Sequence, residues 1–302
     1  MNHANRMTTA HPLRHDAAVM FENVVAGALT GVLDDQTARD VIALAKGLVS
    51  PSGTLTLLHV DLVTDKPAPD SAAAADRARC RRAVRRLTAL ADQFWADADV
   101  CCVESRSPRG GLHEFATRQH ADLLVVGASR GDVDDRTFVG DDTRQALEDA
   151  PCAVAVAPPG FAARAGAIRK IGVGFDGSPG SERAVALARR LATEHRAQLS
   201  ACEVVPDTDY AGDPWDVKGD VDERVEAARQ RVAALGQLEP NAEVGDAADE
   251  LASYGRSVDL LVIGSHNYRP LDHLLGGSTA QRLADEISSP LLVLPATEPD
   301  GA

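Results

Sequence analysis

The chain repeats itself, and this repetition restricts its fold more than any other feature of the sequence. The segment HADLLVVGASRG (residues 120–131) matches SVDLLVIGSHNY (residues 257–268), and a further glycine follows in both copies at the same distance. The matched positions are Asp122 and Asp259, Gly127 and Gly264, and Gly140 and Gly277. The sequence therefore predicts two copies of one structural unit.

Each copy alternates strand-like and helix-like segments. The strand-like segments are apolar throughout, which is typical of parallel strands covered on both faces by helices. The strands are expected near NVVAG, TLTLLHV, DVCCVE, DLLVVG and CAVAVA, and again near KIGVGF, QLSACEV, AEV, DLLVIG and LLVL. The segments between them have the helical spacing of apolar residues. The predicted class is α/β, with two repeated doubly wound domains, each an open five-stranded parallel sheet with helices on both faces.

The repeat also predicts the domain organisation. Residues 21–157 form the first domain and residues 168–298 the second. Residues 158–167 contain two prolines and two glycines, which suits an exposed linker. Residues 1–20 are expected to form a flexible tail.

Charge and hydropathy exclude some partners. The net charge of -14 opposes nucleic acid and anionic membrane surfaces. No run approaches the roughly 18 apolar residues of a membrane helix. The N-terminal stretch has no apolar segment of the kind found in secretory signals. We expect a soluble, cytoplasmic protein that binds neither nucleic acid nor membrane.

The five cysteines show neither a CxxC pair nor the spacing of a zinc site. Cys102, Cys152 and Cys202 lie in or beside apolar strand-like runs, whereas Cys80 lies in an arginine-rich segment. A thiol in an apolar strand usually acts as a small buried hydrophobic group. We therefore expect these three cysteines to be free and structural.

The segment GSHNYRPLDHLLGGST (residues 264–279) connects an expected strand to an expected helix. The carboxyl ends of parallel strands and the amino-terminal ends of helices are where α/β proteins bind ligands, and helix N-termini favour anions. His266, Arg269 and His273 could also face an anion. A helix capped by Ser278 after a glycine turn is the alternative. There is no Walker GKS/GKT sequence, no GxGxxG after the first expected strand, and no SGGxDS-type loop.

On these residues the chain resembles the universal stress protein family in a tandem form. The resemblance in the second half runs through IGVGFDGSPGSERAVALARRLA, DLLVIGS and SPLLVLP. The ATP-binding branch of the family has a motif of glycine, two residues, glycine, nine residues, glycine and then serine or threonine. This chain has Gly264, Asn267, Gly277 and Ser278 in those places. Asparagine tolerates positive φ better than most residues, so the turn could be kept.

The resemblance implies a role for each matched residue. Asp176, with Gly177 beside it, should contact the ribose or a metal ion such as Mg²⁺. Val204 should offer backbone hydrogen bonds to adenine. The phosphates of ATP, ADP or AMP should be lined by Gly264, Asn267, Gly277, Ser278 and Thr279.

The first half departs from the motif. It has Arg130 in place of the second glycine, and Asp141 and Asp142 follow Gly140. A carboxylate at a helix start repels phosphate, and Leu29 or Thr30 replaces Asp176. We therefore expect the first half to be a structural partner that does not bind nucleotide.

A cluster of arginines accompanies one expected helix of the first half. Its apolar stripe is Ala83, Val84, Leu87 and Leu90, and its arginines are Arg77, Arg79, Arg81, Arg82, Arg85 and Arg86. The arginines are expected to form the solvated face of the helix, and binding of an acidic partner is the alternative.

The family resemblance further implies pairing of the two domains through their last strands, CAVAVA and LLVLP. The result would be an intramolecular pseudo-dimer, which could dimerise again. The predicted function is a stress-response regulator that binds ATP, ADP or AMP and an unknown regulatory protein. It is not expected to be an enzyme, because no nucleophile and base pair is evident, although slow ATP hydrolysis is compatible with the sequence. The alternatives are a nucleotide-free scaffold and an adenylyl-transferring enzyme.

Overall fold

The computed structural model describes residues 20–28, 35–63, 70–95, 97–128, 141–164, 166–207, 221–265, 279–286 and 288–295. The first half contains β1 (Phe21–Ala28), α1 (Asp35–Leu48), β2 (Val49–Leu62), α2 (Asp70–Phe94), β3 (Asp99–Ser105), α3 (Pro108–Arg118), β4 (Leu123–Gly127), α4 (Asp141–Leu147) and β5 (Ala153–Ala157). A short helix, α5 (Phe161–Arg164), follows. The second half contains β6 (Lys170–Gly174), α6 (Pro179–His195), β7 (Gln198–Val205), α7 (Val221–Ala234), β8 (Glu239–Val244), α8 (Ala247–Gly255), β9 (Leu260–Gly264), α9 (Thr279–Glu286) and β10 (Leu291–Leu294).

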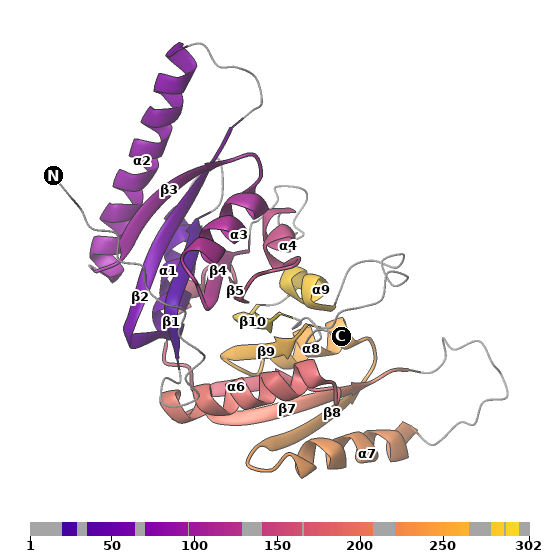
Figure 1. Cartoon of the computed structure of the whole chain (residues 1–302). Coiled ribbons are helices and arrows are strands. Elements are labelled where there is room, and N and C mark those ends of the chain that lie inside the picture. Colours follow the sequence, from indigo (N-terminus) through magenta and orange to yellow (C-terminus); the bar gives the residue numbers. More distant parts are fainter. Residues whose placement is uncertain are drawn as a thin grey trace, which may run out of the picture.

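All ten strands form one sheet with the order β3-β2-β1-β4-β5-β10-β9-β6-β7-β8. Strands within each half are parallel, whereas β5 and β10 are antiparallel, with Val154 opposite Val293 and Val156 opposite Leu291. The two halves therefore lie end to end along one sheet, with their last strands at the junction (Figure 1). This arrangement confirms the predicted fold class and the pairing of the domains through their last strands.

Helices cover both faces of the sheet, as predicted. One buried cluster joins the sheet to α1, α2, α6 and α7, and a second joins the opposite face to α3, α4, α8 and α9. Strand residues alternate between the clusters; Val24 lies in the first and Val25 in the second. Both faces are apolar because both are covered, which explains why the strand sequences do not alternate.

The repeated aspartates hold the beginnings of the central strands. The carboxylate of Asp122 accepts hydrogen bonds from the backbone N–H groups of Glu22 and Asn23, at 2.7 and 3.0 Å. Asp259 accepts the equivalent bonds from Arg169 and Lys170, at 2.8 and 2.9 Å. The DLLV repeat thus has a structural cause in both halves.

The segment between the halves is anchored to α1. Asp40 is almost fully buried, and its carboxylate accepts hydrogen bonds of 2.7 Å from the N–H groups of Gly160 and Ala162. Pro158 is buried, whereas Gly166 and Ala167 are exposed. Exposure therefore increases along this segment toward the second half.

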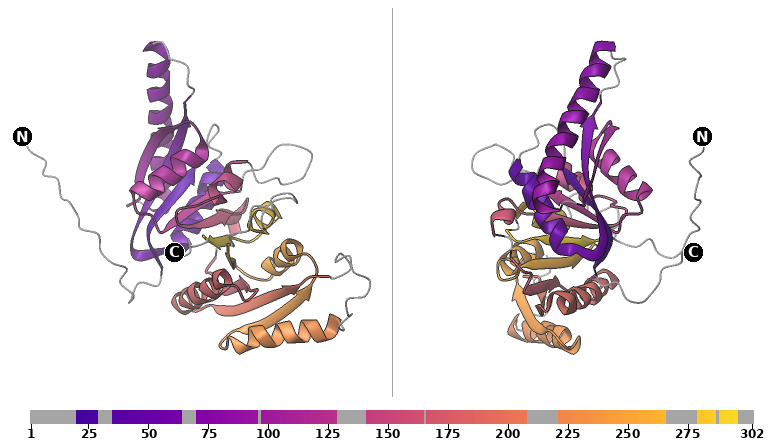
Figure 2. Two further views of the ribbon diagram at one scale, coloured as in Figure 1. Left: turned by 45° about the vertical axis from the view of Figure 1, so that its right-hand side comes forward. Right: turned by 90° about the vertical axis from the view of Figure 1, so that its left-hand side faces the viewer.

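The arginine-rich helix is α2, whose amino-terminal turns project past the sheet (Figure 2). Ala83, Leu87 and Leu90 are buried, and the arginines of α2 that follow Arg77 are exposed. The side chain of Arg77 lies outside those described. The predicted solvated face is confirmed for Arg79, Arg81, Arg82, Arg85 and Arg86.

The expectation for Cys102 is wrong. Its sulfur is bonded to that of Cys80, which lies on the facing helix α2. Cys152 and Cys202 are free and buried, as expected, and burial raises the pKa of both thiols to about 12. The sequence pattern did not show the pairing because it depends on how α2 crosses β3. Within the described ranges, no helix has the length and apolar character needed to cross a membrane.

Candidate functional site

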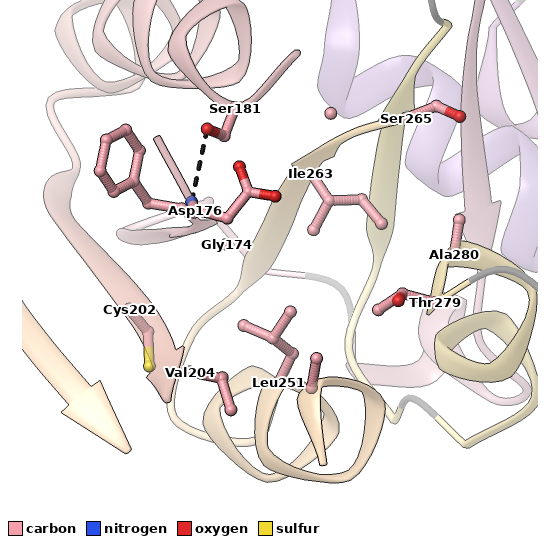
Figure 3. Close-up of a pocket in the computed structure, with 13 residues that line it drawn as sticks. Gly174, Asp176, Ser181, Cys202, Val204, Leu251, Ile263, Ser265, Thr279 and Ala280 are labelled. Carbon is pink, nitrogen blue, oxygen red and sulfur yellow. Dashed lines mark hydrogen bonds between the residues drawn. The ribbon is translucent and has the colours of Figure 1, made fainter. Parts of the chain in front are cut away.

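A pocket of about 120 Å³ opens at the carboxyl ends of β6, β7 and β9 in the second half. Ligands of open α/β sheets bind at this edge. Figure 3 shows Asp176, Val204 and Thr279 on different sides of the pocket. Its lining comprises Gly174, Phe175, Asp176, Ser181, Cys202, Val204, Ala247, Leu251, Ile263, Gly264, Ser265, Thr279 and Ala280.

Asp176 follows β6 and shapes the turn into α6. Its Oδ1 accepts a hydrogen bond of 3.0 Å from the N–H of Ser178, and its own N–H donates to Ser181 Oγ at 3.4 Å (Figure 3). Ser178 in turn caps α6, because its Oγ accepts from the N–H of Ser181 at 3.1 Å. The carboxylate is thus fixed beside the amino-terminal end of a helix, where backbone N–H groups favour anions.

Gly177 has a conformational role in this turn. Its φ of 77° lies in the left-handed region, which glycine adopts without a steric cost. A Cβ atom at this position would meet no atom within 4 Å, and Gly177 is absent from the pocket lining. Its observed contribution is therefore to the chain path between β6 and α6.

Gly264 is required by packing. A Cβ atom added to it would lie 2.2 Å from the carbonyl carbon of Gly180 and 2.3 Å from its oxygen. The end of β9 therefore lies directly against the first turn of α6, and any side chain on Gly264 would separate them. This contact brings the N-terminus of α6 to the edge of the pocket.

Val204, Cys202 and Leu251 provide an apolar wall between β7 and α8. Such a surface suits the flat face of a heterocyclic ring. Cys202 is fully buried, and the high pKa of its thiol makes it a poor nucleophile near neutral pH.

The opposite edge of the pocket is formed by α9, which begins at Thr279. Arg282 of this helix donates to the carboxylates of Asp246 and Asp249 in α8, at 2.8 and 3.0 Å. The Arg282 hydrogen bond lowers the pKa of Asp246, whose other oxygen caps α8 through the N–H of Ala248 at 2.9 Å. The ion pairs hold α9 against α8 and thereby position Thr279.

The remaining predicted site residues, Asn267, Gly277 and Ser278, lie outside the described residues, as do His266, Arg269 and His273. Ser265 and Thr279 both line the pocket, so the chain leaves it at one and returns at the other. The pocket volume of about 120 Å³ is smaller than the roughly 300–1,000 Å³ of typical ligand pockets.

The structure offers limited support for a metal site. No cluster of three or more His, Cys, Asp or Glu side chains suited to a metal occurs in the described part of the chain. Mg²⁺ is often held by one or two carboxylates together with substrate phosphates. Asp176 could supply one carboxylate to such a site, and the described lining residues include no second carboxylate.

At the equivalent place in the first half, the described part of α3 packs closely on β2. The strand registers make Val60 of β2 the counterpart of Val204, and Val60 is almost fully buried. A Cβ atom on Gly111 of α3 would lie 2.6 Å from Val60 Cγ1, so the helix backbone sits directly on the strand.

The helix that follows β4, α4, is also held against β4 by a hydrogen bond. Thr143 of α4 is fully buried and donates a hydrogen bond of 2.8 Å to the carbonyl of Gly127. Ala280 stands in the corresponding place in α9 and has no hydroxyl to make this bond. Leu29, Thr30, Arg130 and Gly140 lie outside the described residues, and the side chains of Asp141 and Asp142 are not among those described.

A larger cavity of about 450 Å³ lies beneath α8 near the beginnings of β6 and β7. Its lining includes Glu239, Glu243, Glu250 and Tyr254. It lies at the opposite ends of the strands from Asp176 and is not the edge at which α/β sheets bind ligands. The smaller pocket is therefore the better candidate.

Sequence reasoning missed several lining residues, including Ser181, Ala247 and Leu251. Ser181 lies in the first turn of α6, and the general preference of helix starts for anions could have indicated it. Cys202 precedes Val204 by two positions in a strand, so the period of two places both on one face. Ala247 and Leu251 come from a helix whose packing the sequence does not specify.

The profile described as the universal stress protein family matches residues 20–158 and 167–295. The chain belongs to the universal stress protein family. Each half carries one copy of the family domain, which agrees with the repeated sheet and with the DLLV repeat.

Solved structures share the complete two-domain fold. A universal stress protein from Archaeoglobus fulgidus DSM 4304 has a TM-score of 0.68 and 12% identity, over 92% of this chain and 98% of that one. A putative universal stress protein from Pseudomonas aeruginosa UCBPP-PA14 has a TM-score of 0.60 and 17% identity, over 92% of this chain and 94% of that one.

Another solved structure matches less than half of this chain. It is a universal stress protein in complex with cAMP, which is 26% identical over 44% of this chain and 100% of that one, with a TM-score of 0.33.

Proposed function

We propose that this protein binds an adenine nucleotide, ATP or the related ADP or AMP, in its second half. The observation that carries this proposal is the convergence of Asp176, Val204, Gly264 and Thr279 on one pocket, although they come from different elements. Through this site it would act as a cytoplasmic stress-response regulator that binds a partner protein.

The chemistry of the pocket matches the parts of a nucleotide. The apolar wall of Val204 and Leu251 would contact adenine, and Asp176 would bind ribose hydroxyls or a Mg²⁺ ion. The amino-terminal end of α9 would face the phosphates, with Thr279 donating a hydroxyl hydrogen bond. By the family resemblance, Asn267, Gly277 and Ser278 would complete the proposed phosphate loop.

The proposed role of the site is to bind nucleotide, and not to catalyse its reaction. The described lining residues contain no histidine or lysine that could act as a general base. Cys202 is held as a neutral thiol by burial. The protein would therefore respond to nucleotide by a change in stability or partner affinity.

Thermal unfolding with and without ATP and Mg²⁺ tests this function. A ligand at 100 times its Kd stabilises the folded state by about 2.7 kcal/mol, which raises the Tm by several degrees. We expect Asp176→Ala to abolish the shift, and Asp176→Asn to keep the turn because an amide oxygen can still accept from Ser178 N–H. Asp92→Ala, at an exposed site on α2, is the matched control.

The control should retain the full shift. If millimolar ATP, ADP, AMP and cAMP all leave the Tm of the wild-type protein unchanged, the proposal fails and the nucleotide-free scaffold is favoured. Release of pyrophosphate in a substrate screen would instead indicate adenylyl transfer.

A further inference from the structure

Cys80 and Cys102 join α2 to β3 at the end of the sheet farthest from the nucleotide site. Their Cα atoms are 5.9 Å apart, within the range of about 4.4–6.8 Å that a disulfide spans. β3 is the outermost strand of the first half, and both cysteines are partly exposed. The bond thus lies at a partly exposed edge of the sheet.

The surroundings of Cys80 are strongly basic. Arg79 and Arg81 flank it in the sequence, Arg82 follows, and all three are exposed. Arg79 forms an ion pair with Asp61 at 3.2 Å, whereas Arg81 and Arg82 have no ion-pair partner within the described ranges. Positive charge near a thiol favours the thiolate, which is the nucleophilic form. The arginine cluster, which the nucleotide site does not use, thus adjoins Cys80 in the sequence.

The other three cysteines lie in different environments. Cys101 packs with the cluster on the opposite face of the sheet, and burial and the charge of Asp99 raise the pKa of its thiol. Cys152 and Cys202 are buried, with pKa values raised to about 12. These thiols are internal controls for reactivity.

We propose that Cys80 and Cys102 are a reversible redox-modification site, with peroxide as the oxidant and dithiols as the reductant. In the oxidation, the Cys80 thiolate attacks a peroxide oxygen, which yields a sulfenic acid and one water once a proton is taken up. The Cys102 thiol then displaces the hydroxyl as a second water and forms the disulfide. Two thiols lose two electrons and two protons, and hydrogen peroxide becomes two waters.

In the reverse reaction, a dithiol such as dithiothreitol attacks one sulfur and releases the other as a thiol. The second thiol of the reagent then resolves the mixed disulfide and becomes part of a cyclic disulfide. Ala83, Leu87 and Leu90 keep α2 packed in either state. Reduction therefore frees the turn around Cys80 while the core of the first half stays intact.

Differential alkylation followed by peptide mass spectrometry tests the site. After treatment with peroxide, we expect a linked pair of peptides containing Cys80 and Cys102. After dithiothreitol, both should react with iodoacetamide in the folded protein, Cys80 faster than Cys101, while Cys152 and Cys202 react only on denaturation. Absence of the linked peptides, or a link that dithiothreitol opens only in denaturant, would overturn the proposal.

Two sets of variants separate the chemistry from folding. Cys80→Ser and Cys102→Ser should each lose the link, and Cys101→Ser should retain it.

The arginine variants test the reactivity of Cys80. In reduced protein, Arg81→Gln/Arg82→Gln should slow alkylation of Cys80 near neutral pH by about two- to fourfold. The reason is that each lost positive charge, acting through screening solvent, modestly reduces the stabilisation of the Cys80 thiolate. Arg118→Gln/Arg229→Gln, at exposed sites elsewhere, should leave the rate unchanged. Equal rates in both double variants would refute the role given to the arginines.

Discussion

The side chain of Arg144 in α4 binds the carboxylate of Asp285 in α9 and so joins the two halves of the chain. An equivalent contact runs in the opposite direction, because Gln281 of α9 donates a hydrogen bond of 3.1 Å to Glu148, the residue that follows α4. The two pairs correspond under the offset that relates Gly127 to Gly264. The halves therefore meet as a pseudo-symmetric pair, in which α4 and α9 make equivalent contacts on either side of the β5 and β10 junction.

The ion pair between Arg144 and Asp285 should stabilise this junction measurably. Asp285 is largely buried and Arg144 is partly exposed, so the pair is better shielded than a surface ion pair. A double-mutant cycle of Arg144→Ala and Asp285→Ala should give a coupling free energy of about 0.5–1.5 kcal/mol in urea unfolding. Additive effects of the two substitutions would show that the contact contributes nothing.

Replacing Gly264 by alanine should destabilise the second half strongly. The new Cβ atom would lie 2.2 Å from backbone of α6, which cannot move without separating the helix from β9. We expect a loss of about 3 kcal/mol in the free energy of unfolding, at the upper end of overpacking costs.

Gly166→Ala is the matched control, because a Cβ atom there would meet nothing within 4 Å. Its effect on urea unfolding should stay within about 0.5 kcal/mol. Equal stability of the Gly264 and Gly166 variants would contradict the close packing of α6 on β9.

Removal of Arg282 should weaken the attachment of α9 in a pH-dependent way. The pKa of Asp246 is lowered in the folded state, chiefly by the hydrogen bond from Arg282. The contribution of this bond is therefore complete above the ordinary pKa of 3.8 and is lost as the pH falls below it.

The stability difference between wild type and Arg282→Ala should accordingly be present at pH 7 and shrink below about pH 4. Because both side chains are partly exposed, the difference at pH 7 should not exceed about 1 kcal/mol. Chemical denaturation at several pH values measures it. A difference that is the same at pH 3 and pH 7 would mean that packing, and not the charge pair, determines the effect.

The sequence predicted the fold because its signals are local and repeated. Apolar runs such as LLVV mark strands buried on both faces, and the repeated glycines and aspartates align the halves. The pairing of β5 with β10 was implied by the family resemblance, and the apolar character of both last strands agrees with it. The pairing of Cys80 with Cys102 was not predicted, because it depends on the crossing of α2 over β3.

The candidate site, like the fold, could be predicted only in part. Asp176, Val204 and Thr279 lie at ends of elements, where topology alone brings residues together. Gly264 was assigned to phosphate contact, but its tight contact with Gly180 comes from the approach of α6 to β9, which no spacing reveals. The close contacts of Gly111 and Thr143 with the strands of the first half also depend on helix packing.

Native mass spectrometry with ATP and Mg²⁺ decides whether the second half holds a nucleotide, because it counts the nucleotides bound to each chain. We expect one nucleotide per chain, lost in Asp176→Ala and kept in Asp92→Ala. No bound nucleotide, or a second nucleotide that persists in Asp176→Ala, would contradict the assignment of the site to the second half.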